Sequence, residues 1–490
     1  MKYLLGIDFG GGASKATLLC EDGKIAATSS VEYPTHYPQP GRTEQDPQDW
    51  VNATVTNIAG VLAKSKVKSS DIVAISLDAA THTAVIMDEN FNVIRPSIYW
   101  TDTRSTGEVQ YLRENYGDII RKQVLHEPDT IWSLPELLWI KNNEEDTWKK
   151  VKKILFAKDY VRHMLTGDYV TDYIEAEGSM LFDAPNRCWS EELCGILGIK
   201  TSDMPKIVKP TDIVGSITEE AAKMTGLKAG TPVLCGTTDT VMEVFASGAV
   251  EKGQMTLKLA TAGRICLISD KPYPDKNLIN YSHIIDGLYY PGTATKSCAA
   301  SLRWYRDTFG GDYRELDEGA EKIAIGADGL VFHPYLNGEL TPYANPALCA
   351  DFVGVRASHT KAHFTRAVLE GVAMSMLDCV IALEEFNIPH DDTAVIIGGG
   401  GQSPLWRQIV SDALGMKFIQ KKYSDSSLGS AMLAGVAAGI FSSAREAAEK
   451  CNEIISETVP NPENTKAYAE LFKKYKAIQK ALQPIYEGKF

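Results

Sequence analysis

The sequence has few of the features that mark secreted or membrane proteins. Its nine cysteines form no CxxC pair, Cys188 and Cys194 being the nearest two, so free thiols in a reducing compartment are expected rather than a zinc site or a disulfide framework. The longest apolar stretch, 428–441, is too short and too rich in Gly and Ala to span a bilayer. It predicts a tightly packed, buried helix. Met1 leads directly into an apolar run with no room for a signal peptide, and we expect a cytoplasmic protein.

Positive charge and the common nucleotide motifs are also scarce. The chain carries 50 Lys and Arg against 63 Asp and Glu, a formal net charge of −13. This balance argues against binding to nucleic acid or to an anionic membrane surface. No GxxxxGK[ST] segment occurs and no GxGxxG spacing is cleanly met, so neither a Walker A loop nor a Rossmann site is expected. A phosphate site must be local, built from backbone amides and a few cations.

Length and alternation of segments predict an α/β protein. With 490 residues, 44% apolar and 23% charged, the chain suits two large globular domains. Strand-like and helix-like segments alternate throughout. The segments expected on spacing alone are a helix over 47–63, strands over 72–77 and 83–87, and a largely helical region over 132–166.

The first twenty residues carry the clearest chemical signal. A strand-like run, 3–7, ends in Asp8 and turns on Gly10, Gly11 and Gly12 before a second strand-like run that starts at Lys15. Glycines let backbone N–H groups approach phosphates, and an acid can hold hydrated Mg²⁺. The alternative is a plain β-hairpin whose glycines only turn the chain.

Similar strand and turn units recur later in the chain. A strand over 231–235 leads through a Gly-Thr-Thr turn to Asp239, a run over 255–259 breaks at 261–263, and a strand over 394–397 ends in four glycines. The recurrence suggests an internal duplication with a cleft between two related domains. We expect the domains to be 1–247 and 248–490. Asp8 would lie on one wall of the cleft, and residues 239, 261 and 399–400 on the other.

Each candidate residue also has a structural alternative. Asp239 could accept the proton of an attacking hydroxyl in phosphoryl transfer, or cap a helix that starts near residue 241. The glycines at 398–401, followed by Gln402, could present a helix N-terminus to a nucleotide. His82 could bond a polyol or be a satisfied polar group. Trp100 could stack on a sugar or pack in the core.

Read together, these pieces resemble the FGGY family of carbohydrate kinases. The C-terminal signature of that family is met throughout 350–370, ADFVGVRASHTKAHFTRAVLE. An earlier signature is visible over 133–140, where Glu136 replaces the usual Lys. Within the family the chain is most similar to the xylulokinases, through His82 and the segment 98–104.

The resemblance implies two ribonuclease-H-like domains, as in actin, hexokinase and Hsp70, closing over Mg-ATP and a sugar. It implies ATP-dependent phosphorylation of a terminal hydroxyl of a small sugar, with D-xylulose or a related ketose as the expected substrate. The partners are then ATP and a sugar; a homodimer is left open. The roles that it implies are a metal residue, Asp8; a general base, Asp239; sugar-binding residues, Thr81, His82, Trp100, Asp239 and Thr240; and nucleotide-binding residues, Gly10, Gly11, Gly12, Lys15, Thr261, Gly263, Gly399, Gly400 and Gln402.

Several positions depart from the family pattern and keep alternatives open. Thr81 and Thr240 replace the usual Met and Asn where the sugar is read, so another polyol or a sugar acid is an alternative substrate. Gly11 replaces Thr in the first phosphate turn, 260–263 reads ATAG rather than GTSG, and Leu340 replaces Arg. Weakened ATP use would make the chain a sugar- or nucleotide-binding regulator. An ATPase of the same fold, such as a chaperone, is a further alternative.

Overall fold

Two strands joined by the glycine turn begin the chain and organise its first sheet. In the computed structural model, which describes residues 1–275 and 277–489, β1 (Tyr3–Phe9) pairs antiparallel with β2 (Ala13–Cys20). On its other side β1 pairs parallel with β5 (Ile72–Ala79). All three strands are largely buried, as their apolar runs predict. The predicted hairpin is confirmed.

The first sheet has the strand order β13-β14-β5-β1-β2-β3, and β15 pairs with β5 beside this path. The further strands of this sheet are β3 (Ile25–Glu32), β13 (Ile213–Ser216), β14 (Pro232–Leu234) and β15 (Thr237–Thr238). Outside this sheet lie the short strands β4 (Glu44–Gln45), β6 (Ala84–Met87), β7 (Ser97–Ile98), β8 (Lys153–Phe156), β9 (Val170–Asp172), β10 (Phe182–Asp183), β11 (Cys188–Trp189) and β12 (Lys206–Val208).

The second sheet repeats the plan of the first. Its order is β18-β17-β16-β21-β22-β23. Counted from β3 in the first sheet and from β18 in the second, the successive pairings are antiparallel, antiparallel, parallel, parallel and antiparallel. The expected duplication is therefore present in the topology, with the β16–β17 hairpin as the counterpart of β1–β2. The strands are β16 (Met255–Leu259), β17 (Gly263–Leu267), β18 (Gly292–Thr295), β21 (Thr393–Ile397), β22 (Lys417–Lys421) and β23 (Ile454–Thr458), with β19 (Val331–His333) and β20 (Asp351–Val353) paired separately.

The chain divides into two units near the expected boundary, but not by a single cut. The first unit comprises 1–250 together with 281–288 and 423–452, and the second holds the remaining described residues. By these contacts 281–288 and 423–452 group with the first unit, whereas the sequence-based expectation placed them in the C-terminal domain. Local sequence patterns could not reveal this exchange, because it depends on contacts between segments far apart in the chain.

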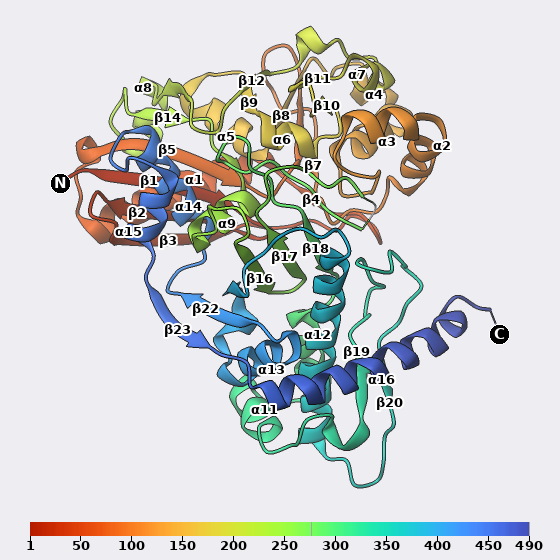
Figure 1. The fold of residues 1–490 in the computed structure, drawn as a ribbon. Coiled ribbons are helices and arrows are strands. Elements are labelled where there is room, and N and C mark those ends of the chain that lie inside the picture. The colour runs from red at the N-terminus through yellow and green to blue at the C-terminus, as the bar shows by residue number, and fades with distance from the viewer. Residues whose placement is uncertain (276, 490) are drawn as a thin grey trace. The chain divides into compact units, whose positions relative to one another are not determined.

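Helices cover the sheet of each unit (Figure 1). The first unit has α1 (Pro47–Ser65), α2 (Thr106–Gln123), α3 (Ser133–Asn143), α4 (Glu145–Trp148), α5 (Ala157–Thr166), α6 (Tyr173–Gly178), α7 (Glu191–Leu197), α8 (Glu219–Thr225), α9 (Asp239–Ser247), α14 (Ser426–Ala437) and α15 (Ala444–Cys451). The second unit has α10 (Ala299–Phe309), α11 (Tyr313–Ala320), α12 (Lys361–Glu384), α13 (Pro404–Leu414) and α16 (Pro462–Tyr486). The region 132–166, expected to be largely helical, also contains strand β8, whose apolar residues pair with β6.

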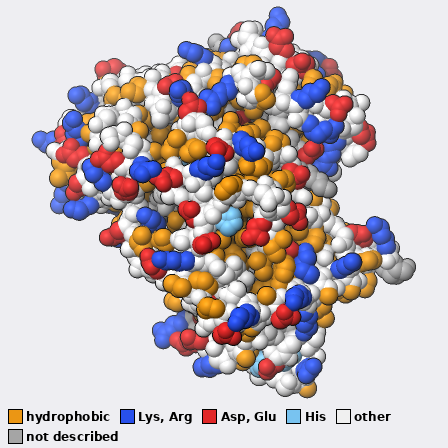
Figure 2. Space-filling model, viewed as in Figure 1, with side chains coloured by type: hydrophobic (Ala, Val, Ile, Leu, Met, Phe, Trp, Pro, Cys, Tyr) orange, Lys and Arg blue, Asp and Glu red, His pale blue; other side chains and the backbone are white. Residues whose placement is uncertain are grey.

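All nine cysteines are free thiols. No helix within the described part of the chain is long and apolar enough to cross a membrane. Figure 2 shows acidic and basic side chains interspersed over the visible face rather than gathered into a continuous basic patch.

Helix α14 is the tightly packed helix that the Gly- and Ala-rich run predicts. In Figure 1 it lies beside the strands of the first sheet. Gly6 of β1 makes this approach possible, because a Cβ there would lie 1.9 Å from the carbonyl oxygen of Ser427 and 2.4 Å from the backbone nitrogen of Ala431. Both contacts are with helix backbone, which a rotamer change cannot move. The returning segment 423–452 therefore depends on a glycine near the start of the chain.

We predict that Gly6→Ala destabilises the protein by about 2–3 kcal/mol, because the added methyl must push α14 away from β1. Chemical denaturation measures the loss. Gly107→Ala on α2 is the control, since a Cβ there has nothing within 4 Å and alanine favours a helix. Equal stability of Gly6→Ala and the native protein would contradict the packing described.

Candidate active site

Two buried carboxyl groups lie opposite each other where β1 and β5 end. The register places Asp8 opposite Asp78 on β5 and opposite Lys15 on β2. Burial raises the pKa of Asp8 to about 7, and burial followed by the charge of Asp8 raises the pKa of Asp78 well above its usual value. Each carboxyl group affects the pKa of the other. We infer that Asp78 keeps its proton beside Asp8.

Residues of the returning segment 423–452 complete this group. The hydroxyl of Ser430 donates to Asp78 Oδ2 over 2.5 Å. Lys15 Nζ forms an ion pair with Asp425 at 2.6 Å, so this predicted nucleotide residue already has an acidic partner. The hydrogen bonds from α14 thus fix the side chains around Asp8.

Side chains hold the glycine turn after β1 by donating hydrogen bonds to its carbonyl groups. The hydroxyl of Tyr33 donates to the carbonyl oxygen of Gly10, and Thr35 and Gln45 side chains each donate to that of Gly11 over 2.9 Å. In a trans peptide the carbonyl and the following N–H point in opposite directions. The N–H groups of residues 11 and 12 therefore point away from these side chains, as a phosphate-binding turn requires.

Asp239 is the first residue of α9 and lies in the same unit as Asp8. It is partly exposed, and its Oδ1 accepts the backbone N–H of Thr240 over 2.6 Å and the hydroxyl of Thr81 over 3.3 Å. Its charge contributes to the raised pKa of Asp8. Placing Asp239 on the wall opposite Asp8 was therefore wrong. The N-cap of α9 is Thr238, so Asp239 is not the capping residue.

His82 is held in a left-handed backbone conformation, with φ of 53°. Its backbone N–H donates to the Glu175 carboxylate over 2.5 Å, and its carbonyl accepts the hydroxyl of Ser133 over 2.5 Å. A Cβ on Gly178 would lie 2.5 Å from His82 Cδ2, so glycine leaves room for the ring. Such strain persists where neighbouring groups fix it and is common at binding sites.

Helix α6 supports both segments that carry predicted sugar residues. Lys158, fully buried, forms ion pairs with Asp159 at 2.5 Å and Asp172 at 2.8 Å, and lies 4.0 Å from Glu175. Asp172 accepts the hydroxyl of Thr237, two residues before Asp239, over 2.8 Å. Glu175, on α6, accepts the backbone N–H of His82. The predicted general base and the predicted sugar-binding histidine are thus both connected to one buried ammonium group.

Sequence reasoning missed these supporting residues and the segment that returns from the second half. Glu177 accepts the backbone N–H and the hydroxyl of Ser282, and the Tyr281 hydroxyl lies 3.4 Å from His82 Nε2. Burial raises the pKa of Glu177 to about 7. The closely spaced acids Asp172, Glu175 and Glu177 are the one sequence signal for this support. Such a cluster of acids usually indicates an exposed helix face, so the sequence alone does not show that they are buried.

Trp100 is 41% exposed and stands beside a rigid ion-pair network. Asp102 accepts from Arg104, which also pairs with Glu44 at 2.8 Å. Glu136, the replacement for the family Lys, is buried nearby, and burial with the charge of Asp102 raises its pKa well above the usual value. A neutral Glu136 avoids placing a further negative charge against this network.

The second unit contains a turn built like the first. Between β16 and β17, the backbone N–H of Ala299 donates to the carbonyl of Ala260 over 2.7 Å, and that of Cys298 donates to Thr261 over 3.0 Å. The start of α10 thus holds the carbonyls, and the N–H groups of residues 261 and 262 point away from it. Gly263 is required by packing, since a Cβ would lie 2.6 Å from Met376 Sδ.

The glycines after β21 have different reasons to be glycine. Gly398 has φ of 89°, and a Cβ there would lie 2.6 Å from a backbone oxygen; a Cβ on Gly400 would lie 2.9 Å from the Leu259 side chain. Nothing lies within 4 Å of a Cβ on Gly399, which is exposed. Gln402 is also exposed and accepts from Gln420 over 3.1 Å. Only Gly399 therefore lacks a packing reason among these three glycines.

The oxygen ligands around Asp8 suit Mg²⁺ bound through water and phosphate. Asp8 Oδ1 is buried without a hydrogen-bond partner among the described residues. No group of three His, Cys, Asp or Glu side chains in the described ranges is arranged to hold a metal directly. Mg²⁺ commonly keeps several waters and takes one or two carboxylates plus substrate phosphates. Asp8, with the nearby charge of Asp239, fits that pattern.

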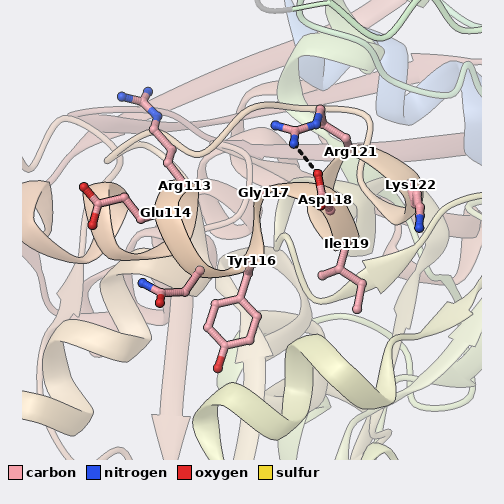
Figure 3. Close-up of a pocket in the computed structure, with 9 residues that line it drawn as sticks. Arg113, Glu114, Tyr116, Gly117, Asp118, Ile119, Arg121 and Lys122 are labelled. Carbon is pink, nitrogen blue, oxygen red and sulfur yellow. Dashed lines mark hydrogen bonds and ion pairs between the residues drawn. The ribbon is translucent and has the colours of Figure 1, made fainter.

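A surface hollow of about 370 Å³ lies elsewhere, along α2 (Figure 3). Its lining residues all fall between Arg113 and Lys122, and Arg121 pairs with Asp118 at 2.5 Å. None of the predicted site residues lines it.

Comparison with known proteins agrees with this fold. Residues 3–246 match the N-terminal domain, and residues 268–438 the C-terminal domain, of the FGGY family of carbohydrate kinases. The chain belongs to this family and is a carbohydrate kinase with the two-domain, actin- and hexokinase-like fold.

Its relatives include enzymes for two kinds of substrate. It is 33% identical to a xylulose kinase of Bacillus subtilis, over 98% of this chain and 97% of that protein. It is 31% identical to a gluconokinase of the same organism, over 89% and 88%. Ligand-bound xylulose kinase from Lactobacillus acidophilus superposes with a TM-score of 0.93 at 26% identity over 100% of both chains, and gluconate kinase from that organism with 0.92 at 27% over 99% of both.

We predict that Asp78→Asn makes the free energy of unfolding less sensitive to a rise in pH. Because the pKa values of Asp8 and Asp78 are raised on folding, their protons stabilise the folded state at acidic pH, and this contribution is lost as pH rises toward about 7. Asn can donate to Asp8 without titrating. The free energy of unfolding of the variant, measured relative to that of the native protein, should rise by on the order of 1–2 kcal/mol as the pH increases from about 5 to about 8.

Unfolding by urea with EDTA present measures this gain. Glu89→Gln, an exposed acid, is the control and should show no comparable change between the two pH values. A variant that loses stability relative to the native protein as pH rises would refute the raised pKa values of Asp8 and Asp78.

Proposed function

We propose that the protein transfers the γ-phosphoryl group of ATP to a terminal hydroxyl of a neutral ketose, with D-xylulose as the preferred substrate. The observation that carries the choice of a neutral sugar is the absence of Lys and Arg from the predicted sugar residues, Thr81, His82, Trp100, Asp239 and Thr240. The nearby cation Arg104 is paired with Asp102 and Glu44. A sugar carboxylate would meet Asp239 without a compensating charge.

Asp239 would act as general base. Its carboxylate is partly exposed and accepts hydrogen bonds from Thr240 and Thr81, which orient it. As the sugar oxygen attacks phosphorus, the carboxylate accepts the hydroxyl proton. Thr81 and His82 would bind other sugar hydroxyls, and Trp100 would cover one face of the sugar.

Asp8 and the glycine turns would serve the nucleotide. Mg²⁺ supplies charge neutralisation to the phosphates when bound, and Asp8 would hold its hydration shell. The outward N–H groups of residues 11 and 12 would bind phosphate oxygens, and those of 261 and 262, with Gly399, would do the same in the second unit. Lys15, already paired with Asp425, would act through its charge.

A gluconate-specific enzyme is the second candidate, supported by the gluconokinases among the relatives. A catalytically weak regulator would bind sugar and nucleotide without turnover.

An ADP-release assay with D-xylulose, D-ribulose, L-ribulose, D-gluconate and glycerol separates these functions. We predict that kcat/KM for D-xylulose exceeds that for D-gluconate by about a hundredfold, because an unpaired carboxylate facing Asp239 costs several kcal/mol. A preference for gluconate would overturn the neutral-sugar proposal. Binding of both ligands by calorimetry without turnover on any sugar would identify a regulator.

We predict that Asp239→Asn lowers kcat by about 10³-fold while sugar binding changes little, because Asn keeps the shape and an acceptor but cannot take the proton. Steady-state kinetics and sugar calorimetry measure the two effects. Glu219→Gln is the matched control, since Glu219 is likewise the first residue of a helix, α8, but is exposed. Asp239→Asn turning over within about tenfold of the native enzyme would exclude Asp239 as the base.

A further inference from the structure

A tyrosine hydroxyl occupies the space beside Gly11, where a side chain of the first turn would otherwise lie. A Cβ at position 11 would be 3.0 Å from the hydroxyl oxygen of Tyr99, 3.7 Å from Cζ and 3.9 Å from Cε1. The hydroxyl, not the ring, is therefore the nearest group. A threonine at position 11 would crowd it, so the glycine and the tyrosine are sterically linked.

Tyr99 is firmly held in this position. It follows β7 directly, it is 5% exposed, and its backbone N–H donates to Thr43 over 2.9 Å. Its carbonyl accepts the backbone N–H of Asp102 over 2.8 Å, and the Asp102 carboxylate returns to the backbone N–H of Thr43 over 2.5 Å. This closed set of hydrogen bonds fixes where the ring enters the site.

The surroundings of the hydroxyl show which groups it faces. After burial, the charge of Asp239 contributes most to the raised pKa of Tyr99, and Asp8 adds to it. The ring of Trp100 is its neighbour, with the two ring centroids 6.0 Å apart. A phenolic hydroxyl carries one proton that it can donate to an acceptor. The hydroxyl thus lies among the glycine turn, the proposed base and the proposed metal residue.

We propose that Tyr99 is a further phosphate-binding residue, whose hydroxyl donates to a phosphoryl oxygen of ATP at the Gly10–Gly12 turn in place of a side-chain hydroxyl at position 11. This proposal rests on the proposed assignment of that turn to the phosphates. It explains how a turn of three glycines, without a hydroxyl of its own, can supply a side-chain donor.

The test exchanges the two positions. Because a hydrogen bond to a charged oxygen is lost, Tyr99→Phe should weaken binding of magnesium AMP-PNP by about tenfold or more. Gly11→Thr alone should weaken it similarly by crowding the Tyr99 hydroxyl. The double variant Gly11→Thr/Tyr99→Phe removes the crowding and restores a hydroxyl, so it should return to within about threefold of the native Kd, a strongly non-additive result.

Calorimetry on the full chain measures binding without any sugar, and ADP release with the best carbohydrate of the panel measures KM for ATP. Tyr33→Phe is the matched control, because the Tyr33 hydroxyl supports the same turn through the Gly10 carbonyl. Adding Gly11→Thr to Tyr33→Phe should worsen binding rather than rescue it. Thermal unfolding of each variant reports whether a loss of binding comes from loss of fold.

The outcomes distinguish the proposal from its premise. If Gly11→Thr weakens nucleotide binding but Tyr99→Phe does not, the Tyr99 role is overturned and the turn assignment stands. If neither variant affects binding, the turn does not hold phosphate and both are overturned. If both single variants weaken binding and the double variant is no better than either, the hydroxyl exchange is refuted.

Discussion

Inward-facing carbonyl groups at the two hairpin turns are the constraint on which the proposed chemistry depends. In the first unit the side chains of Tyr33, Thr35 and Gln45 hold the carbonyls of Gly10 and Gly11. In the second unit the start of α10 does the same for Ala260 and Thr261 through backbone N–H groups. Peptide geometry then directs the following N–H groups outward. Two different structural solutions thus produce the same row of donors.

Buried charge organises the predicted sugar-binding residues of the first unit. Lys158 is surrounded by carboxylates, and those carboxylates extend to Thr237 before the proposed base and to the backbone of His82. Removing one member would leave a charge unpaired in the interior, which costs more than the pair contributes. The main effect of the network is therefore to fix one arrangement of the proposed site. Its net contribution to the free energy of unfolding is small by comparison.

Two departures from the family pattern have physical reasons in this structure. Gly11 leaves room for the Tyr99 hydroxyl, and Glu136 is a buried acid whose raised pKa keeps it uncharged beside Asp102. These changes do not remove the outward N–H groups of the first turn. These two substitutions, which looked like signs of a weakened enzyme, are thus accommodated by neighbouring residues.

Strands, turns and the family were predictable from the sequence because they depend on local patterns. Residues close together in the chain define the hairpin that contains Asp8, the repeat at 255–268 and the signature at 350–370. The position of Asp239 beside Asp8, the return of 423–452 to the first unit and the support of His82 by α6 were not predictable. They depend on contacts over long separations, such as that of Ser430 with Asp78, which no periodicity encodes.

A crystal structure with magnesium AMP-PNP and D-xylulose tests the central claim most directly. The account predicts phosphate oxygens within about 3 Å of the N–H groups of Gly11 and Gly12, and a sugar hydroxyl hydrogen-bonded to Asp239. A triphosphate that leaves these N–H groups unbound, with the sugar away from Asp239, would contradict it.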